Sequence, residues 1–201
     1  LRPIDYFEKR GSAQCKTCVM LASLNTPGEM RIFAKKSRNH TELMFKNLKM
    51  PITVKQKGEI DIIKASRPDK LNPFNLDIPG DISSSAFFIA LTLLSKNSYL
   101  VLKNINLNPS RLGIIKIFNK MGAGIKTKNI KLNKGEKCGD IIVKSNKKLK
   151  AINCPSYLNS SAIDEFLIIF LIAARSKGIS YFKNLSELDK KESPRLKLGS
   201  K

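Results

Sequence analysis

Three nearly uninterrupted apolar segments recur in this chain, and they constrain its fold more than any other feature of the sequence. Each segment opens on polar residues, and a short run of strand-forming residues follows it. The three segments are residues 12–24, 83–94 and 163–174. Self-similarity at long, regular intervals is the sequence signature of repeated supersecondary units. The chain is therefore predicted to contain several copies of one unit.

A small residue after each apolar segment sets the register of the repeat. These residues are Gly28, Ser98 and Gly178, separated by 70 and then 80 positions. The same offsets place three polar residues at one equivalent position: Gln14, Ser84 and Asp164. We therefore expect these three side chains in the first turn of each apolar helix.

The repeated unit is predicted to be a helix, a strand, a second helix and a further strand. The apolar segments are about a dozen residues long, too short for a bilayer span of about 20 residues, and nearly apolar all round, which predicts buried core helices. The expected strands are residues 30–33, 99–105, 139–144 and 181–185. The second helices are expected at residues 41–48 and 114–121. Residues 126–137 are expected to form exposed hairpins or loops.

The composition supports a folded, basic chain that binds small anions. The hydrophobic fraction is 42% and the formal net charge is +21. Lysine is spread along the whole chain, and basic runs such as residues 144–150 lack the interleaved aromatic side chains that stack on bases. We therefore expect no nucleic-acid partner, whereas Arg and Lys clusters suit phosphate groups.

The cysteines and the single histidine exclude several chemistries. Cys15 and Cys18 form one CxxC inside the first apolar segment, while Cys138 and Cys154 stand alone. A zinc site needs about four ligands at matched spacing, so all four thiols are predicted to be buried in a reducing cytoplasm, with no metal. His40 is the only histidine, which leaves little material for a Ser-His-Asp or His-metal mechanism.

The ends of the chain indicate an internal fragment of a longer protein. The chain begins with Leu1-Arg2-Pro3, without an initiator Met, and stops at Gly199-Ser200-Lys201, just after a helix is expected to start. The first residues are not a charged region followed by an apolar one, so we expect no signal peptide, no membrane anchor and a cytoplasmic location.

Short motifs lie in six places along the chain. They are Ser12-Ala13-Gln14-Cys15-Lys16, Leu21 to Gly28, Ser37 to Glu42, Pro79 to Phe87, Asn108 to Gly113 with Met121 to Ala123, and Ile163-Asp164-Glu165 with Glu187 to Arg195. In this order and at this spacing, they resemble the motifs of the EPSP synthase (3-phosphoshikimate 1-carboxyvinyltransferase) family. The resemblance covers nearly the whole chain.

The resemblance implies an α/β (α+β) fold, the inside-out α/β barrel of the enolpyruvyl transferases. Such proteins contain six βαβαββ-type units with buried helices, three in each of two domains, and an active site in the cleft between domains. Both domains would be partial here. Residues 1–78 would be the C-terminal part of the first, shikimate-phosphate-binding domain, and residues 79–201 the first half of the second, with the crossover near Ile78-Pro79-Gly80.

The resemblance also implies the reaction and its residues. The enolpyruvyl group of phosphoenolpyruvate passes to the 5-hydroxyl of shikimate 3-phosphate and phosphate is released, a step of the shikimate pathway toward chorismate and the aromatic amino acids, without cofactor or metal. The expected catalytic residues are Asp164 as proton acceptor, Lys191 and Glu192. The expected shikimate 3-phosphate ligands are Ser12, Ala13, Gln14, Arg38, Asp164 and Lys191, and the expected phosphoenolpyruvate ligands are Gln14 and Arg195.

Each of these roles has a simpler structural alternative. Ser12 caps a helix in the alternative reading, and Arg38 is a solvated loop arginine. In the same alternative, Asp164 interacts only with the positive end of a helix dipole, and residues 190–195 form an exposed charged segment without a role in binding.

Two other functions stay open at this point. One is the related transferase that acts on UDP-N-acetylglucosamine, and the other is a non-catalytic or RNA-binding relative of the fold. Pro194 stands where the family has Asp, and this difference keeps the non-catalytic alternative open. For the transferase we expect two small anionic substrates as partners, no membrane, and a monomer at full length. The fragment alone is expected to be inactive, because other binding residues of the family lie outside it.

Overall fold

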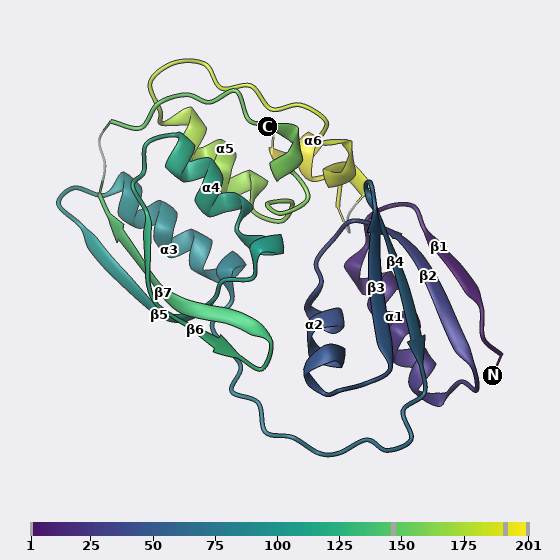
Figure 1. Cartoon of the computed structure of the whole chain (residues 1–201). Helices are drawn as coiled ribbons and strands as arrows, with labels where there is room; N and C mark the ends of the chain where they lie inside the picture. The colour runs from purple at the N-terminus through teal and green to yellow at the C-terminus, as the bar shows by residue number, and fades with distance from the viewer. Residues whose placement is uncertain (1, 146–147, 191–192, 200–201) are drawn as a thin grey trace. The chain divides into compact units, whose positions relative to one another are not determined.

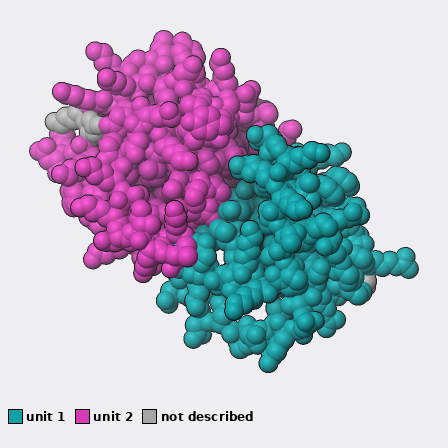
Figure 2. Space-filling model, viewed as in Figure 1, with its two compact units in different colours: residues 1–77, 133–136 teal, residues 78–132, 137–201 magenta. Residues whose placement is uncertain are grey.

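The chain divides into two compact units, each with its own sheet and core (Figure 1). The computed structural model describes residues 2–145, 148–190 and 193–199. Unit 1 comprises Leu1–Asp77 and Asn133–Glu136, and unit 2 comprises Ile78–Leu132 and Lys137–Lys201 (Figure 2). The assignment of a substrate-binding domain to residues 1–78 stays a prediction.

Unit 1 is a four-stranded sheet with two helices. Its elements are β1 (Asp5–Glu8), α1 (Ala13–Ala22), a 3-10 turn (Ser23–Asn25), β2 (Glu29–Lys35), α2 (His40–Asn47), β3 (Ile52–Lys57) and β4 (Ile60–Ser66). The strand order is β1-β2-β4-β3, in which β1 runs parallel to β2 and the other pairs are antiparallel. The parallel connection from β1 to β2 runs through α1, as a parallel crossover requires.

Both helices of unit 1 pack on the same face of this sheet. Alternate residues of a strand point to the same side, so Ile32 and Ala34 of β2 face the helices together with Ile63 of β4, and all three are fully buried. Met20 of α1 and Phe45 of α2 complete this core. Both helices are therefore anchored to the sheet through this shared core.

Unit 2 combines a three-stranded sheet with a larger helical core. Its elements are α3 (Ile82–Leu94), β5 (Tyr99–Asn106), a 3-10 turn (Pro109–Arg111), α4 (Gly113–Lys120), β6 (Lys126–Asn133), β7 (Glu136–Lys144), a 3-10 turn (Ser156–Leu158), α5 (Phe166–Ala174), a 3-10 turn (Ser186–Lys190) and α6 (Arg195–Gly199). The strand order is β5-β7-β6, and the tip of the β6–β7 hairpin belongs to unit 1.

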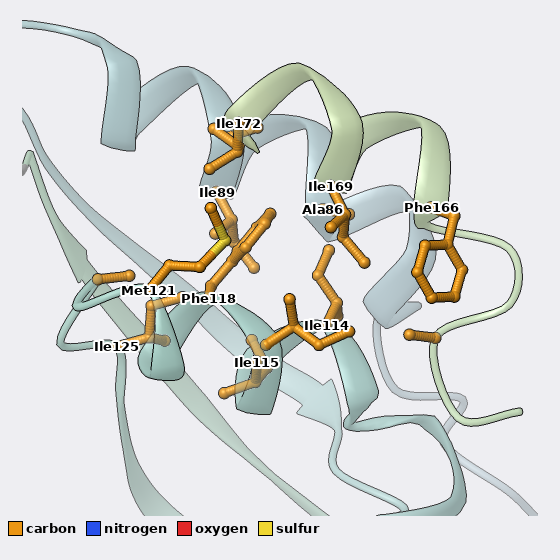
Figure 3. Close-up of a cluster of buried hydrophobic side chains, with 14 of the residues drawn as sticks. Ala86, Ile89, Ile114, Ile115, Phe118, Met121, Ile125, Phe166, Ile169 and Ile172 are labelled. Atoms are coloured by element: carbon orange, nitrogen blue, oxygen red, sulfur yellow. The ribbon is translucent and has the colours of Figure 1, made fainter. Parts of the chain in front are cut away.

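Three helices of unit 2 direct apolar side chains toward one another (Figure 3). Ile89 of α3, Phe118 of α4 and Ile169 of α5 are fully buried in this cluster. Gly113 allows the start of α4 to approach residues 161–162 closely, because a Cβ atom at this position would lie 2.5 Å from Ser161 Oγ. The close approach places the segment before α5 against α4.

Most of the expected elements are confirmed. The three apolar helices, the two amphipathic helices, the hairpin at 126–137 and the strands at 30–33, 99–105 and 139–144 form within a few residues of their expected bounds. The expected strand at 181–185 is wrong. Among the described residues of this segment, Tyr181 forms one isolated parallel bridge, to Asn153. A single bridge is too short a pairing to make a strand.

The expectation of fully buried helices is also wrong for the described structure. Phe87 and Leu91 of α3 are 67% and 65% exposed, Leu171 of α5 is 54% exposed, and Leu21 of α1 is 49% exposed. The residues that the structure describes cover one face of each of these helices and leave apolar side chains on the opposite face uncovered. No described helix is long and apolar enough to cross a membrane.

The prediction of four buried thiols is half correct. Cys138 and Cys154 are buried, and burial raises the pKa of the Cys154 thiol, an effect that the charge of Lys120 only partly offsets. Cys15 and Cys18 are exposed. They lie three residues apart on α1 and share a face, which is not the face that packs on the sheet.

Candidate functional site

The N-terminus of α1 is shaped by two acceptor side chains. Ser12 is the N-cap of the helix, and its Oγ accepts a hydrogen bond of 3.2 Å from the backbone N–H of Cys15. The buried Glu8 carboxylate accepts hydrogen bonds from the backbone N–H groups of Arg10 (2.9 Å) and Gly11 (2.6 Å). Gly11 has a φ of 79°, a conformation that favours glycine. The turn that leads into Ser12 is therefore fixed.

This helix end is suited to an anion. The first N–H groups of a helix have no intrahelical partner and carry the positive end of the helix dipole, and α1 has no acidic residue in its first turn. Ala13 and Gln14 occupy this turn, as expected, and the Gln14 side chain is exposed. Because Ser12 Oγ accepts a hydrogen bond as the cap, its own O–H is still available as a donor to a ligand oxygen.

Arg38 lies directly before α2 and is tied to α1 through its backbone. The ammonium group of Lys16 donates a 2.9 Å hydrogen bond to the carbonyl oxygen of Arg38, and the same group lies 2.6 Å from Glu42 Oε1. The hydroxyl groups of Thr17 and Thr41 are 2.7 Å apart. The first two turns of α1 and the start of α2 therefore form one connected structure.

Unit 2 places the expected proton acceptor beside the expected phosphoenolpyruvate ligand. Asp164 Oδ1 lies 3.1 Å from Nη1 of Arg195, and both side chains are about three-quarters buried. Asp164 is in the turn just before α5 and not in the first turn of the helix, because the helix begins at Phe166 with Glu165 as its N-cap. Lys191 and Glu192 lie outside the described residues.

A second cluster in unit 2 joins the starts of three helices, and the sequence did not predict it. Arg111 donates a hydrogen bond to Ser83 Oγ, which in turn donates to the buried carboxylate of Glu165. Arg111 also pairs with Asp81, at 2.8 Å between Nη2 and Oδ1. The sequence did hold one signal for this cluster, the Ser-Arg dipeptide that precedes the second helix of each unit, as Ser37-Arg38 and as Ser110-Arg111. Arg111 therefore occupies the place in unit 2 that Arg38 occupies in unit 1.

Asp81 is the N-cap of α3, and its environment favours the charged form. Its Oδ2 accepts a hydrogen bond of 2.8 Å from the backbone N–H of Ser84. Partial burial alone would raise the pKa of Asp81, but this hydrogen bond and the charge of Arg111 outweigh burial, so the pKa lies below 3.8. Among the described residues, no group of three or more His, Cys, Asp or Glu could hold a metal ion.

The fold and these residues define a class of protein: repeated α/β units that present polar and charged side chains at the N-terminal ends of apolar helices. A family model described as EPSP synthase (3-phosphoshikimate 1-carboxyvinyltransferase) matches residues 1–200. The chain belongs to the EPSP synthase family.

Individual relatives agree with this family. A 3-phosphoshikimate 1-carboxyvinyltransferase from Thermodesulfovibrio yellowstonii is 39% identical over 199 residues, which are 98% of this chain and 45% of the relative. One from Zymomonas mobilis is 37% identical over 96% of this chain and 43% of its own length. A solved EPSP synthase structure from Acinetobacter baumannii has a TM-score of 0.86 at 34% identity and covers 100% of this chain, which covers 44% of that structure.

These findings confirm the family resemblance and the inside-out α/β fold class. The chain spans less than half the length of the curated relatives that it matches. The roles of the individual site residues stay predictions.

Proposed function

We propose that the complete protein transfers the enolpyruvyl group of phosphoenolpyruvate to the 5-hydroxyl of shikimate 3-phosphate and releases phosphate. The observation that carries this proposal is the family match over residues 1–200. The relatives described above are all named for this reaction, and they do not favour the alternative acceptor UDP-N-acetylglucosamine. The two substrates are small anions, which suits the basic chain.

We assign the binding of shikimate 3-phosphate to unit 1. The phosphate would accept hydrogen bonds from the Ser12 hydroxyl and from the first N–H groups of α1, since helix N-termini bind anions through these groups and the helix dipole. The Arg38 guanidinium would supply the countercharge through parallel N–H donors. Gln14, exposed in the first turn, would donate to the ring hydroxyls and to the enolpyruvyl group.

We assign proton transfer from the acceptor hydroxyl to unit 2. Asp164 would accept the proton of the 5-hydroxyl as its oxygen attacks C2 of phosphoenolpyruvate, while C3 takes up a proton and a tetrahedral adduct forms. Loss of phosphate and of a C3 proton then gives the enolpyruvyl ether. Lys191 would contact the same hydroxyl and the phosphates, and Glu192 would exchange the C3 proton.

The ion pair between Asp164 and Arg195 supports these assignments. Asp164 Oδ1 and Arg195 Nη1 lie 3.1 Å apart, and an arginine beside a carboxylate fixes the direction of both groups. We propose that Arg195 binds phosphoenolpyruvate while it orients Asp164. The acceptor oxygen and the phosphoenolpyruvate anion would then be held by neighbouring groups.

The test is phosphate release by the full-length protein from phosphoenolpyruvate and shikimate 3-phosphate. An Asp164→Asn variant serves as the control, since it keeps the shape of the side chain but removes the base. Turnover by the parent that the variant loses, with both substrates still bound, is the expected result. A parent protein that binds neither substrate would refute the proposal. If the parent protein releases phosphate only with UDP-N-acetylglucosamine, that compound and not shikimate 3-phosphate is the acceptor.

A further inference from the structure

The side chain of Lys16 is fully buried, and its ammonium group joins the two helices of unit 1. Nζ lies 2.6 Å from Glu42 Oε1 and 2.9 Å from the carbonyl oxygen of Arg38. Glu42 is itself only 3% exposed. Well-packed apolar residues often replace a buried ion pair without loss of stability. Stability alone therefore does not account for a charged pair at this place.

The position of Lys16 connects the parts of the proposed phosphate site. It lies four residues after the cap Ser12, so its backbone is one helical turn from the first N–H groups of α1. The carbonyl that it holds belongs to the peptide between Arg38 and Asn39, directly before α2 begins at His40. A hydrogen bond to this carbonyl fixes the plane of that peptide and restricts the direction in which the Arg38 side chain leaves the backbone.

Glu42 acts on Lys16 by charge. Within the residues that the structure describes, the Glu42 carboxylate has no hydrogen-bond partner, so its contact with Lys16 is an ion pair and not an aligned hydrogen bond. The ammonium group is thereby held between Glu42 and the Arg38 carbonyl. A buried, connected polar group of this kind favours one arrangement of the elements that it joins.

We propose that Lys16 is a positioning residue that holds Arg38 in the orientation required to bind the phosphate of shikimate 3-phosphate, with Glu42 holding Lys16 in place. The role rests on the proposed function of unit 1. Lys16 touches no substrate in this account, and it acts through the backbone of Arg38. The sequence motif alone did not indicate this role, because the partners of Lys16 lie more than 20 residues away.

The test is the double variant Lys16→Met/Glu42→Leu in the full-length protein. It removes both charges together, so no buried charge remains unpaired, and it also removes the hydrogen bond to Arg38. The KM for shikimate 3-phosphate is expected to rise about tenfold, as for loss of a hydrogen bond from a charged donor. The KM for phosphoenolpyruvate and the urea midpoint are expected to stay near the parent values. Lys46→Met, at an exposed lysine of α2, is the matched control and should change neither KM.

The dissociation constant of shikimate 3-phosphate is measured by calorimetry in the same variants. An unchanged constant in the double variant would overturn the positioning role, and so would an equal rise in the KM of both substrates. If the apolar pair does not fold, Lys16→Gln/Glu42→Gln replaces it, with the same expectation, because the Gln side chain is shorter than Lys and does not reach the carbonyl. A parent that binds shikimate 3-phosphate without turnover would contradict the proposed reaction, while the binding data still test Lys16.

Discussion

A methyl group added at Gly113 tests how unit 2 holds Asp164. In Gly113→Ala the new Cβ atom would lie 2.5 Å from Ser161 Oγ, 2.6 Å from the Ser161 carbonyl carbon and 2.7 Å from Ala162 Cβ. Ordinary carbon contacts are roughly 3.5–4.0 Å, so the overlap is about 1 Å and involves backbone. The 3.1 Å hydrogen bond from Gly113 N to Ser161 O would also be strained.

The expected cost follows from two opposing terms. Overpacking of a well-packed core costs about 1–3 kcal/mol, and replacing a helical Gly by Ala returns up to about 1 kcal/mol. We therefore expect Gly113→Ala to lower the free energy of unfolding by about 1–2 kcal/mol. Because Ser161 precedes Asp164 by three residues, the displaced backbone should also lower kcat.

Urea unfolding and steady-state turnover of the full-length protein measure the two effects. Gly58→Asn is the control, because Gly58 has a φ of 58° and nothing within 4 Å of its added Cβ, and Asn tolerates this conformation. Its effect on stability should stay within about 0.5 kcal/mol. A Gly113→Ala protein as stable and as active as its parent would refute the argument that this contact positions Asp164.

Three further predictions concern single polar side chains. Asp164→Asn should lower kcat by about 10²–10⁴-fold, as for loss of a positioned base; a wild-type kcat would remove Asp164 from the mechanism. Ser12→Ala should lower the free energy of unfolding by about 1 kcal/mol through loss of the cap and raise the KM for shikimate 3-phosphate; a change in stability alone would leave Ser12 as a cap only. Asp81 has a lowered pKa, so its contribution to stability is present above its unfolded value near 3.8 and is lost as the pH falls through the folded value. Asp81→Asn should therefore be less stable than the parent at pH 7, and the difference between their urea midpoints should shrink as the pH falls below the unfolded value; a difference that grows as the pH falls would contradict this sign.

Much of the fold could be predicted because the relevant signals are local. The apolar runs, the possible cap Ser12 and the Pro79-Gly80 break are read within a few residues, and α1 and α3 begin close to them. The strand expected at 181–185 failed because a strand depends on neighbours from elsewhere in the chain. Local propensity does not reveal that this segment pairs at one isolated bridge.

Burial could not be predicted from composition alone. A helix that is apolar all round indicates complete burial, yet Phe87 of α3 and Leu171 of α5 are more than half exposed. The same limit applies to Cys15 and Cys18, which are exposed although their helix is apolar. Which face is covered depends on the elements that pack against it, and a single helix does not specify them.

The sequence by itself determined the repeat, the fold class and the family, because these depend on the order and spacing of residues along one chain. Only the tertiary structure showed that Lys16 reaches the Arg38 carbonyl, that Arg111 contacts Ser83, and that Arg195 pairs with Asp164. These contacts join residues 22 to 31 positions apart. Their geometry is set by how the helices pack, and no local pattern in the chain encodes it.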